Sequence, residues 1–169
     1  MKILTAMQVQ LTDGERARLI GKGTRNFKAY LKFLEGRDQA IRLNKEANFR
    51  AKQLLEETIA LDSKFGLAYA YLGFCHFFDA MYGWGKSPPS SIQRALDLAQ
   101  KALSLDESQP YSYTLFATIY TLQKQHVKAI GSAEQAVEIS PNLDNTVYTL
   151  GFALRSAGRP FPCERWNLN

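Results

Sequence analysis

An internal repeat is the feature that most restricts what this chain can fold into. Three segments share one ending, in which aliphatic residues lead into a polar turn: 59–63 (IALDS), 103–107 (LSLDE) and 137–141 (VEISP). Leu61 and Leu105 are 44 positions apart, and Leu105 and Ile139 are 34 apart. A period of 34 is typical of a helix-turn-helix unit that buries its apolar face by stacking on the next copy. We therefore expect an all-α chain of stacked helix pairs, one of which holds ten extra residues.

The segment 110–143 carries the packing residues of such a pair most completely. Its first helix offers Tyr113, Phe116, Ala117 and Tyr120, and its second offers Ala129, Ala133 and Ala136, with Pro141 at the exit. Corresponding residues lie upstream at Tyr69, Leu72, Gly73, His76, Ala95, Ala99 and Ala102, and downstream at Val147, Leu150, Gly151 and Leu154. Large residues fill the gaps between helices, and small ones allow two backbones to approach. This pattern resembles the tetratricopeptide repeat.

Three further runs extend the resemblance: 29–37 (AYLKFLEGR), 83–88 (GWGKSP) and 157–160 (AGRP). Together they resemble the tetratricopeptide tails of bacterial class III adenylate/guanylate cyclase-like proteins. In that family a catalytic or other signalling domain comes first, so the resemblance implies that residues 3–15 form a junction leading from such a domain. The likeness covers residues 3 to about 160.

The expected architecture is an α-α superhelix of about three helix pairs, with N-terminal helices and an incomplete last repeat. Residues 1–24 are predicted to be a helical junction, 25–160 the repeat domain and 161–169 an irregular tail. Within the repeat domain, helices are expected over about 25–43, 44–61, 67–82, 88–105, 111–122, 127–139 and 145–157. Asn44 and Ser87 are predicted to cap helices. The extra residues should lie around 82–87 and make Trp84 a protruding ridge.

The composition favours a cytoplasmic protein without a cofactor. No apolar run approaches the roughly 20 residues of a membrane span. The stretch over residues 1–7 is too short and too polar to be the apolar core of a secretory signal. Cys75 and Cys163 are then packing residues rather than a disulfide. Neither His76 nor His126 has a metal-ligand partner at the required spacing, so no metal is expected. Because no nucleophile has a recognisable partner either, we expect that the chain is not an enzyme.

Binding is expected on the first helix of each pair, which lines the concave wall of such a superhelix. Removing the packing residues leaves a face rich in aromatic side chains, with arginines near both ends. The predicted groove residues are Tyr30, Phe33, Arg37, Phe74, Phe78, Tyr111, Thr114, Thr118, Tyr148, Phe152 and Arg155. Aromatic and Arg side chains dominate binding hot spots. The predicted function is a non-catalytic scaffold that binds a peptide or protein, within a larger bacterial signalling protein.

Two alternatives remain open. The last helix lacks a partner helix, so the chain is expected to self-associate as a homodimer through its C-terminal end unless the tail folds back over it. The residues assigned to this contact are Val147, Leu150, Leu154, Phe161 and Trp166. In that reading the chain is a spacer or self-association module. Alternatively, residues 15–52, with eleven Lys or Arg against four acids, form a basic surface for anionic lipid or nucleic acid, although their helical spacing favours a solvated face.

Overall fold

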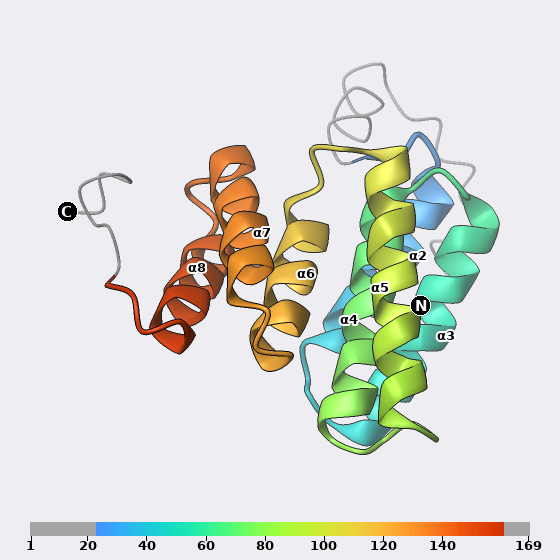
Figure 1. Ribbon diagram of the computed structural model, residues 1–169. Coiled ribbons are helices and arrows are strands. Elements are labelled where there is room, and N and C mark those ends of the chain that lie inside the picture. The colour runs from blue at the N-terminus through green and yellow to red at the C-terminus, as the bar shows by residue number, and fades with distance from the viewer. Residues whose placement is uncertain (1–22, 161–169) are drawn as a thin grey trace.

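The computed structural model describes residues 23–160, which form seven helices and no strand (Figure 1). The helices are α2 (Phe27–Ala40), α3 (Lys45–Leu61), α4 (Gly66–Met81), α5 (Pro88–Leu105), α6 (Pro110–Leu122), α7 (His126–Ile139) and α8 (Asp144–Ser156). The all-α class is confirmed. The expected junction over residues 1–24 lies almost wholly outside the described residues, and the expected tail over 161–169 lies outside them entirely. None of the described helices is long and apolar enough to cross a membrane.

Local chemistry explains where the helices begin and end. Asn44 caps α3 as predicted, because its side-chain oxygen accepts a hydrogen bond from the Ala47 amide at 2.9 Å. Ser87 occupies the cap position of α5 but its side chain makes no capping bond, so that prediction is only half right. Helix α2 ends at Ala40 rather than near Leu43. Leu43 has a φ of 48°, a left-handed conformation that an α-helix of L-residues cannot continue through.

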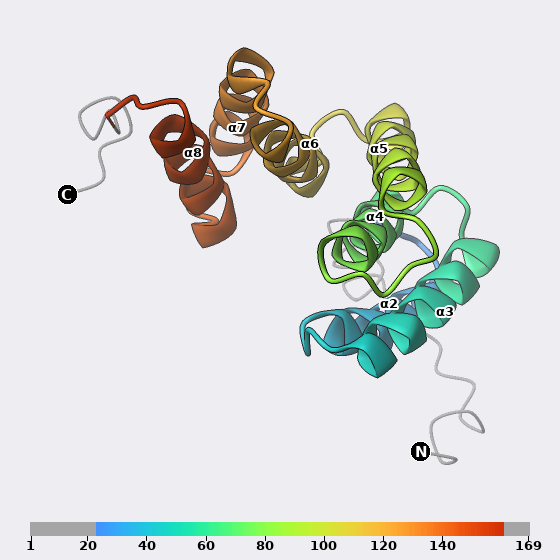
Figure 2. The ribbon, with the colours of Figure 1, turned by 60° about the horizontal axis from the view of Figure 1, so that its bottom comes forward.

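The helices pair and then stack. The pairs are α2 with α3, α4 with α5, and α6 with α7, and α8 packs on both α6 and α7. The first helix of each pair also contacts the first helix of the next, so that α2 meets α4 and α4 meets α6. Figure 2 shows the resulting arc, with α2, α4, α6 and α8 on its inner side and α3, α5 and α7 outside. This is the helical repeat superhelix expected from the sequence.

Small residues set the close approach within each pair. The alanines predicted for this role are fully buried: Ala95, Ala99, Ala102, Ala129, Ala133 and Ala136. A Cβ atom added to Gly73 would lie 3.3 Å from the Ala95 carbonyl oxygen and 2.7 Å from a methyl group of Leu115. Glycine at this position therefore lets α4 lie directly against α5, while a side chain from α6 fills the remaining space.

The ten extra residues lie where they were predicted. Helices α4 and α5 have 16 and 18 residues against 13 and 14 in α6 and α7. The loop over residues 82–87 is also longer than the loop over 123–125. Trp84 is half-buried in this loop and stacks on Tyr82, with ring centroids 4.7 Å apart. It is thus not fully buried, but it forms part of a packed loop rather than a free ridge.

Candidate functional site

One row of aromatic rings links three successive inner helices. The Tyr71 ring on α4 lies 5.3 Å from Phe33 on α2 and 5.2 Å from Tyr111 on α6, measured between centroids. Phe33 also packs on Phe65 and is only 2% exposed. The prediction that Phe33 lines an open groove is therefore wrong, because it fills the junction between two pairs. Burial, with a further contribution from Tyr111, raises the pKa of Tyr71, so its hydroxyl stays protonated.

A second aromatic run follows α4 itself. The centroids of Phe74 and Phe78 are 6.4 Å apart, and those of Phe78 and Tyr82 are 6.2 Å apart, as expected for residues one helical turn from each other. Phe77 is buried against α5 and α6, whereas Phe74 and Phe78 are half-buried at the border of that core cluster. The two latter rings keep part of their surface accessible.

Helix α6 contributes less to the exposed inner face than expected. Tyr111 and Thr118 are half-buried, but Thr114 is 1% exposed and its hydroxyl donates to the Pro110 carbonyl at 3.0 Å. The Thr118 hydroxyl likewise donates to the Thr114 carbonyl at 2.8 Å. The assignment of Thr114 to the groove surface is therefore wrong, because its side chain is packed inward and satisfied by its own helix.

Arg37 and Arg155, the two arginines of the predicted groove, lie on α2 and α8 and are exposed. On α8, Tyr148 is 71% exposed, and the Arg155 guanidinium carbon lies 5.8 Å from the centroid of the half-buried Phe152 ring. This cation–π contact presents a flat, amphipathic surface. On α2, Arg37 is exposed and Tyr30 packs at the edge of the N-terminal core. The structure thus places these five residues on inner helices with side-chain surface accessible.

The expected exposure of the α8 apolar residues is wrong for two of them. Leu150 is 1% exposed and Leu154 is 4% exposed, because both pack into a cluster with residues of α6 and α7 such as Ala117 and Val137. Val147 is half-buried. Phe161 and Trp166, also assigned to self-association, lie outside the described residues. In this structure Leu150 and Leu154 are core residues and are not available to a second chain.

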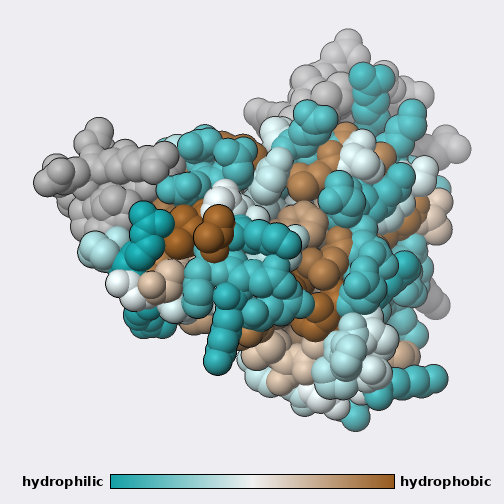
Figure 3. All heavy atoms as spheres, in the orientation of Figure 1, coloured by the Kyte–Doolittle hydropathy of each residue, from teal (hydrophilic) through white to brown (hydrophobic). Residues whose placement is uncertain are grey.

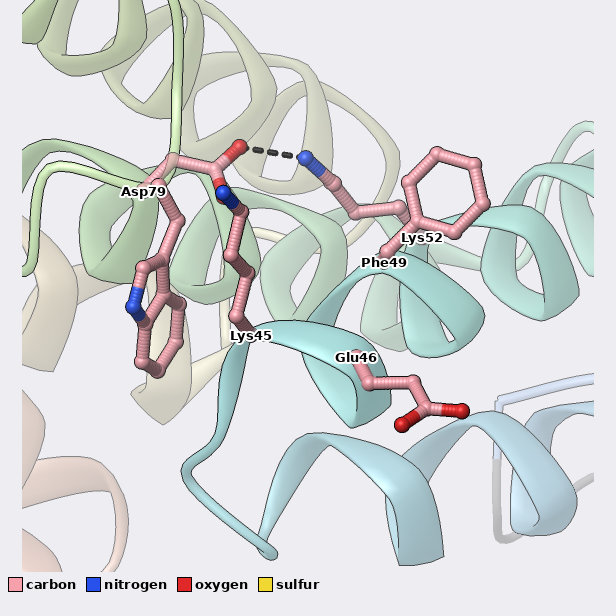
Figure 4. Close-up of a pocket in the computed structure, with 6 residues that line it drawn as sticks. Lys45, Glu46, Phe49, Lys52 and Asp79 are labelled. Atoms are coloured by element: carbon pink, nitrogen blue, oxygen red, sulfur yellow. Dashed lines mark hydrogen bonds and ion pairs between the residues drawn. The ribbon is translucent and has the colours of Figure 1, made fainter.

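A buried polar cluster that the sequence did not reveal joins α3 to α4. The Asn48 amide group donates to Asp79 at 2.8 Å and to the Cys75 carbonyl at 3.1 Å. Lys52 pairs with the other carboxylate oxygen of Asp79, as Figure 4 shows. His76 Nδ1 lies 3.8 Å from the same oxygen, and burial together with the nearby Lys52 lowers the pKa of this imidazole. The charge of the Asp79 carboxylate is therefore balanced by Lys52, and the carboxylate accepts a hydrogen bond from Asn48.

Two shallow hollows flank this cluster beside the 82–87 loop. One, of about 370 Å³, is lined by Lys45, Glu46, Phe49, Lys52, Asp79 and Trp84 (Figure 4). Another, of about 320 Å³, is lined by Lys52, His76, Asp79, Trp84, Gly85, Lys86, Ser90, Ser91 and Arg94. Within residues 23–160, no three His, Cys, Asp or Glu side chains are grouped to hold a metal ion. The first hollow holds two lysines and two acids, whereas the second holds three bases, Lys52, Lys86 and Arg94, against the single acid Asp79, so the second suits an anionic group.

Comparison with known proteins gives one informative likeness. No protein-family model matches the chain. The chain is 30% identical over 114 residues to "Putative adenylate cyclase 3" of Rhizobium meliloti (strain 1021). The match covers 67% of this chain but only 19% of that protein. The chain therefore spans about a fifth of the length of this relative.

Proposed function

We propose that this chain is a tetratricopeptide-type solenoid that binds a segment of another protein along its inner helices, as a module of a larger signalling protein. One observation carries the proposal. Within the described helices, every Phe and Tyr except Phe49 belongs to α2, α4, α6 or α8. Some of these rings build the core, but others on the same inner helices keep part of their surface accessible. A solenoid needs aromatic residues for packing, but packing alone does not require rings that stay accessible.

The chemistry of the accessible residues favours a protein ligand. Aromatic rings bury a large area with few rotatable bonds, and Arg adds directional hydrogen bonds, so these residues concentrate binding energy. Tyr148, Phe152 and Arg155 lie together on α8, while Phe74 and Phe78 offer a second patch on α4. An extended or helical peptide laid across the arc would contact both patches.

The proposal includes the absence of catalysis by this chain. Its buried carboxylate, Asp79, is engaged by Lys52 and Asn48, and the neighbouring His76 is half-buried with a lowered pKa. These groups join α3 to α4, which is a structural role. The relative carries the name of an adenylate cyclase, and we place this chain in a non-catalytic part of such an architecture. Turnover of ATP or GTP by the purified chain would contradict this assignment.

Peptides selected from a random display library against the wild-type chain provide the test. The double change Phe152→Ala with Arg155→Ala should lower the affinity for a selected peptide by roughly 30-fold or more, because loss of a hot spot costs about 2 kcal/mol or more of binding free energy. Phe74→Ala should also lower the affinity for the peptide. Lys101→Ala on α5 and Gln135→Ala on α7 are matched controls on outer helices and should leave the affinity unchanged. Titration calorimetry measures all four.

The result can also favour the alternative reading. If the inner-helix variants bind the selected peptides as tightly as the wild type, the inner face is not the binding surface. If in addition the wild type shows twice its monomer mass, a spacer or self-association module describes the chain better.

A further inference from the structure

Exposed hydrophobic residues gather at one edge of the solenoid. This edge, here called the turn edge, comprises residues 41–49, 81–87 and 122–128, where the turns within the three helix pairs lie (bottom of Figure 1). Within residues 23–160, seven of the ten large hydrophobic residues with exposed side chains belong to it: Ile41, Leu43, Phe49, Met81, Tyr82, Leu122 and Val127. Val127 is 87% exposed and Ile41 is 65% exposed. Single exposed apolar residues are ordinary, but their concentration on one edge is not.

The same edge is basic, and the opposite edge is acidic. The turn edge, residues 41–49, 81–87 and 122–128, holds one acid, Glu46, and five bases: Arg42, Lys45, Lys86, Lys124 and Lys128. The opposite edge, made of residues 23–26, 61–66, 105–110 and 139–144, holds two bases, Arg25 and Lys64, and four acids: Asp62, Asp106, Glu107 and Asp144. Each edge contains both beginnings and ends of helices, so the helix dipole does not explain the difference.

The hollows of the polar cluster add cationic sites at this edge. Lys45 borders one hollow, and Lys86 and Arg94 border the other. In the described part of the chain, none of these three side chains makes an ion pair. Free cations beside a shallow, open depression suit a phosphate-bearing group that approaches from outside.

We propose that the turn edge docks on an anionic lipid bilayer. Exposed aliphatic side chains at the turns, such as Leu43 and Val127, enter the interfacial region, and the lysines between them meet the lipid phosphates. Tyr82 and Trp84 have the amphipathic rings that favour this depth. The acidic opposite edge then points away from the negative surface.

The geometry favours a bilayer over an acidic protein as the occupant. The apolar side chains lie on three separate turns with basic residues interspersed, rather than side by side in one groove. Figure 3 shows one side of the molecule, where strongly apolar atoms lie along the junction of α5 and α6, and the turn edge forms the lower outline of that view. A protein ligand would require a continuous complementary surface, whereas a fluid interface accepts separate insertion points.

Sedimentation of the full chain with lipid vesicles tests the proposal. Binding is expected to mixed phosphatidylglycerol and phosphatidylcholine vesicles and not to phosphatidylcholine alone, and it should weaken as the salt rises from about 0.1 M to about 1 M. The pair Lys124→Glu and Lys128→Glu should lower the partition coefficient by at least about 25-fold, since each lysine contributes about fivefold. The pair Leu122→Ser and Val127→Ser should also lower it, and both of these residues are exposed enough to be changed without unfolding.

The opposite edge supplies a matched control. Leu61→Ser with Lys64→Glu changes an exposed leucine and a lysine there and should leave vesicle binding unchanged. Trp84 gives an independent readout in a Trp166→Phe background, because its fluorescence should shift to the blue when vesicles bind. Far-ultraviolet circular dichroism checks that each variant is folded.

Four results would overturn the proposal. These are no binding to anionic vesicles, unchanged binding by both turn-edge variants, equal loss in the opposite-edge control, and binding without a change in Trp84 fluorescence. A different result would identify the edge as a protein-binding surface instead. In that case the chain does not bind vesicles but binds an acidic amphipathic peptide, and the turn-edge variants bind this peptide less tightly. Peptide binding by the inner helices is a separate property, and the turn-edge variants should leave it intact.

Discussion

At the scale of single residues, the junction of α3 and α4 depends on a buried acid. Asp79 keeps 5% of its side chain exposed, and Lys52 keeps 20%. The Asp79 backbone carbonyl also accepts hydrogen bonds from the amides of Trp84 and Gly85, at 3.0 and 3.2 Å. One residue thus links α3 through its side chain and fixes the 82–87 loop through its main chain.

Removing the cation should therefore cost much of the stability of the chain. Lys52→Met retains the aliphatic stem but leaves the Asp79 carboxylate buried without a counter-charge, a loss of about 3 kcal/mol in the free energy of unfolding. Adding Asp79→Asn to Lys52→Met should restore part of the lost free energy of unfolding, because a neutral amide needs no cation. Urea denaturation measures both. Lys101→Met, on the exposed face of α5, is the control, and an equal loss there would contradict the role given to the ion pair.

At the scale of elements, α8 shows how the last described helix packs against the rest of the solenoid. Its inward residues Leu150, Ala153 and Leu154 pack into a core shared with α6 and α7. Its other side carries Tyr148 and Arg155, which are exposed. The two sides have different roles, and a substitution on each distinguishes them.

We expect Leu150→Asp to unfold the C-terminal pair rather than to separate two chains. The change removes a buried leucine, which alone costs about 2 to 5 kcal/mol, and it adds a buried charge. Tyr148→Ser should leave the helix content and the melting temperature nearly unchanged, since surface substitutions usually cost little. Circular dichroism and light scattering over a dilution series measure both variants. A wild-type dimer that Leu150→Asp converts into a folded monomer would show that Leu150 belongs to a self-association contact.

The elements were also the part of the structure that the sequence predicted best. The spacing of 34 and 44 residues located the pairs and the long loop, because packing in a solenoid repeats with the chain. Leu43 shows the limit of this reasoning, since its left-handed backbone ends α2 early and no pattern in the sequence indicates it. Boundaries elsewhere agree within a residue or two.

The candidate site was predicted less completely, for a physical reason. A repeat pattern indicates which face of a helix is turned inward but not how far the next unit overlaps it. Phe33 and Thr114 were therefore placed on a surface that neighbouring residues cover. Tyr71 was missed because it lies outside the repeat positions, although it links α2 to α6. The Lys52–Asp79 pair joins different repeats, and nothing in a periodic pattern reveals such a contact.

At the scale of the whole molecule, the chain presents three chemically distinct surfaces. The inner helices carry accessible aromatic rings, the turn edge carries exposed apolar and basic residues, and the opposite edge is acidic. Figures 1 and 2 show where these helices and edges lie. A peptide on the inner side and a bilayer at the turn edge would not compete for the same residues. This separation makes the binding function testable without interference from the edge.

Nuclear magnetic resonance of the labelled chain, titrated with a selected peptide, tests the binding function most directly. Amide signals should move in the inner helices, above all around Phe74 and Phe78 on α4 and around Tyr148 and Phe152 on α8. Signals of the outer helices α3, α5 and α7 should stay nearly constant. Shifts confined to the outer helices or to the turn edge would contradict the proposal that this solenoid binds its protein partner along the inner side of the arc.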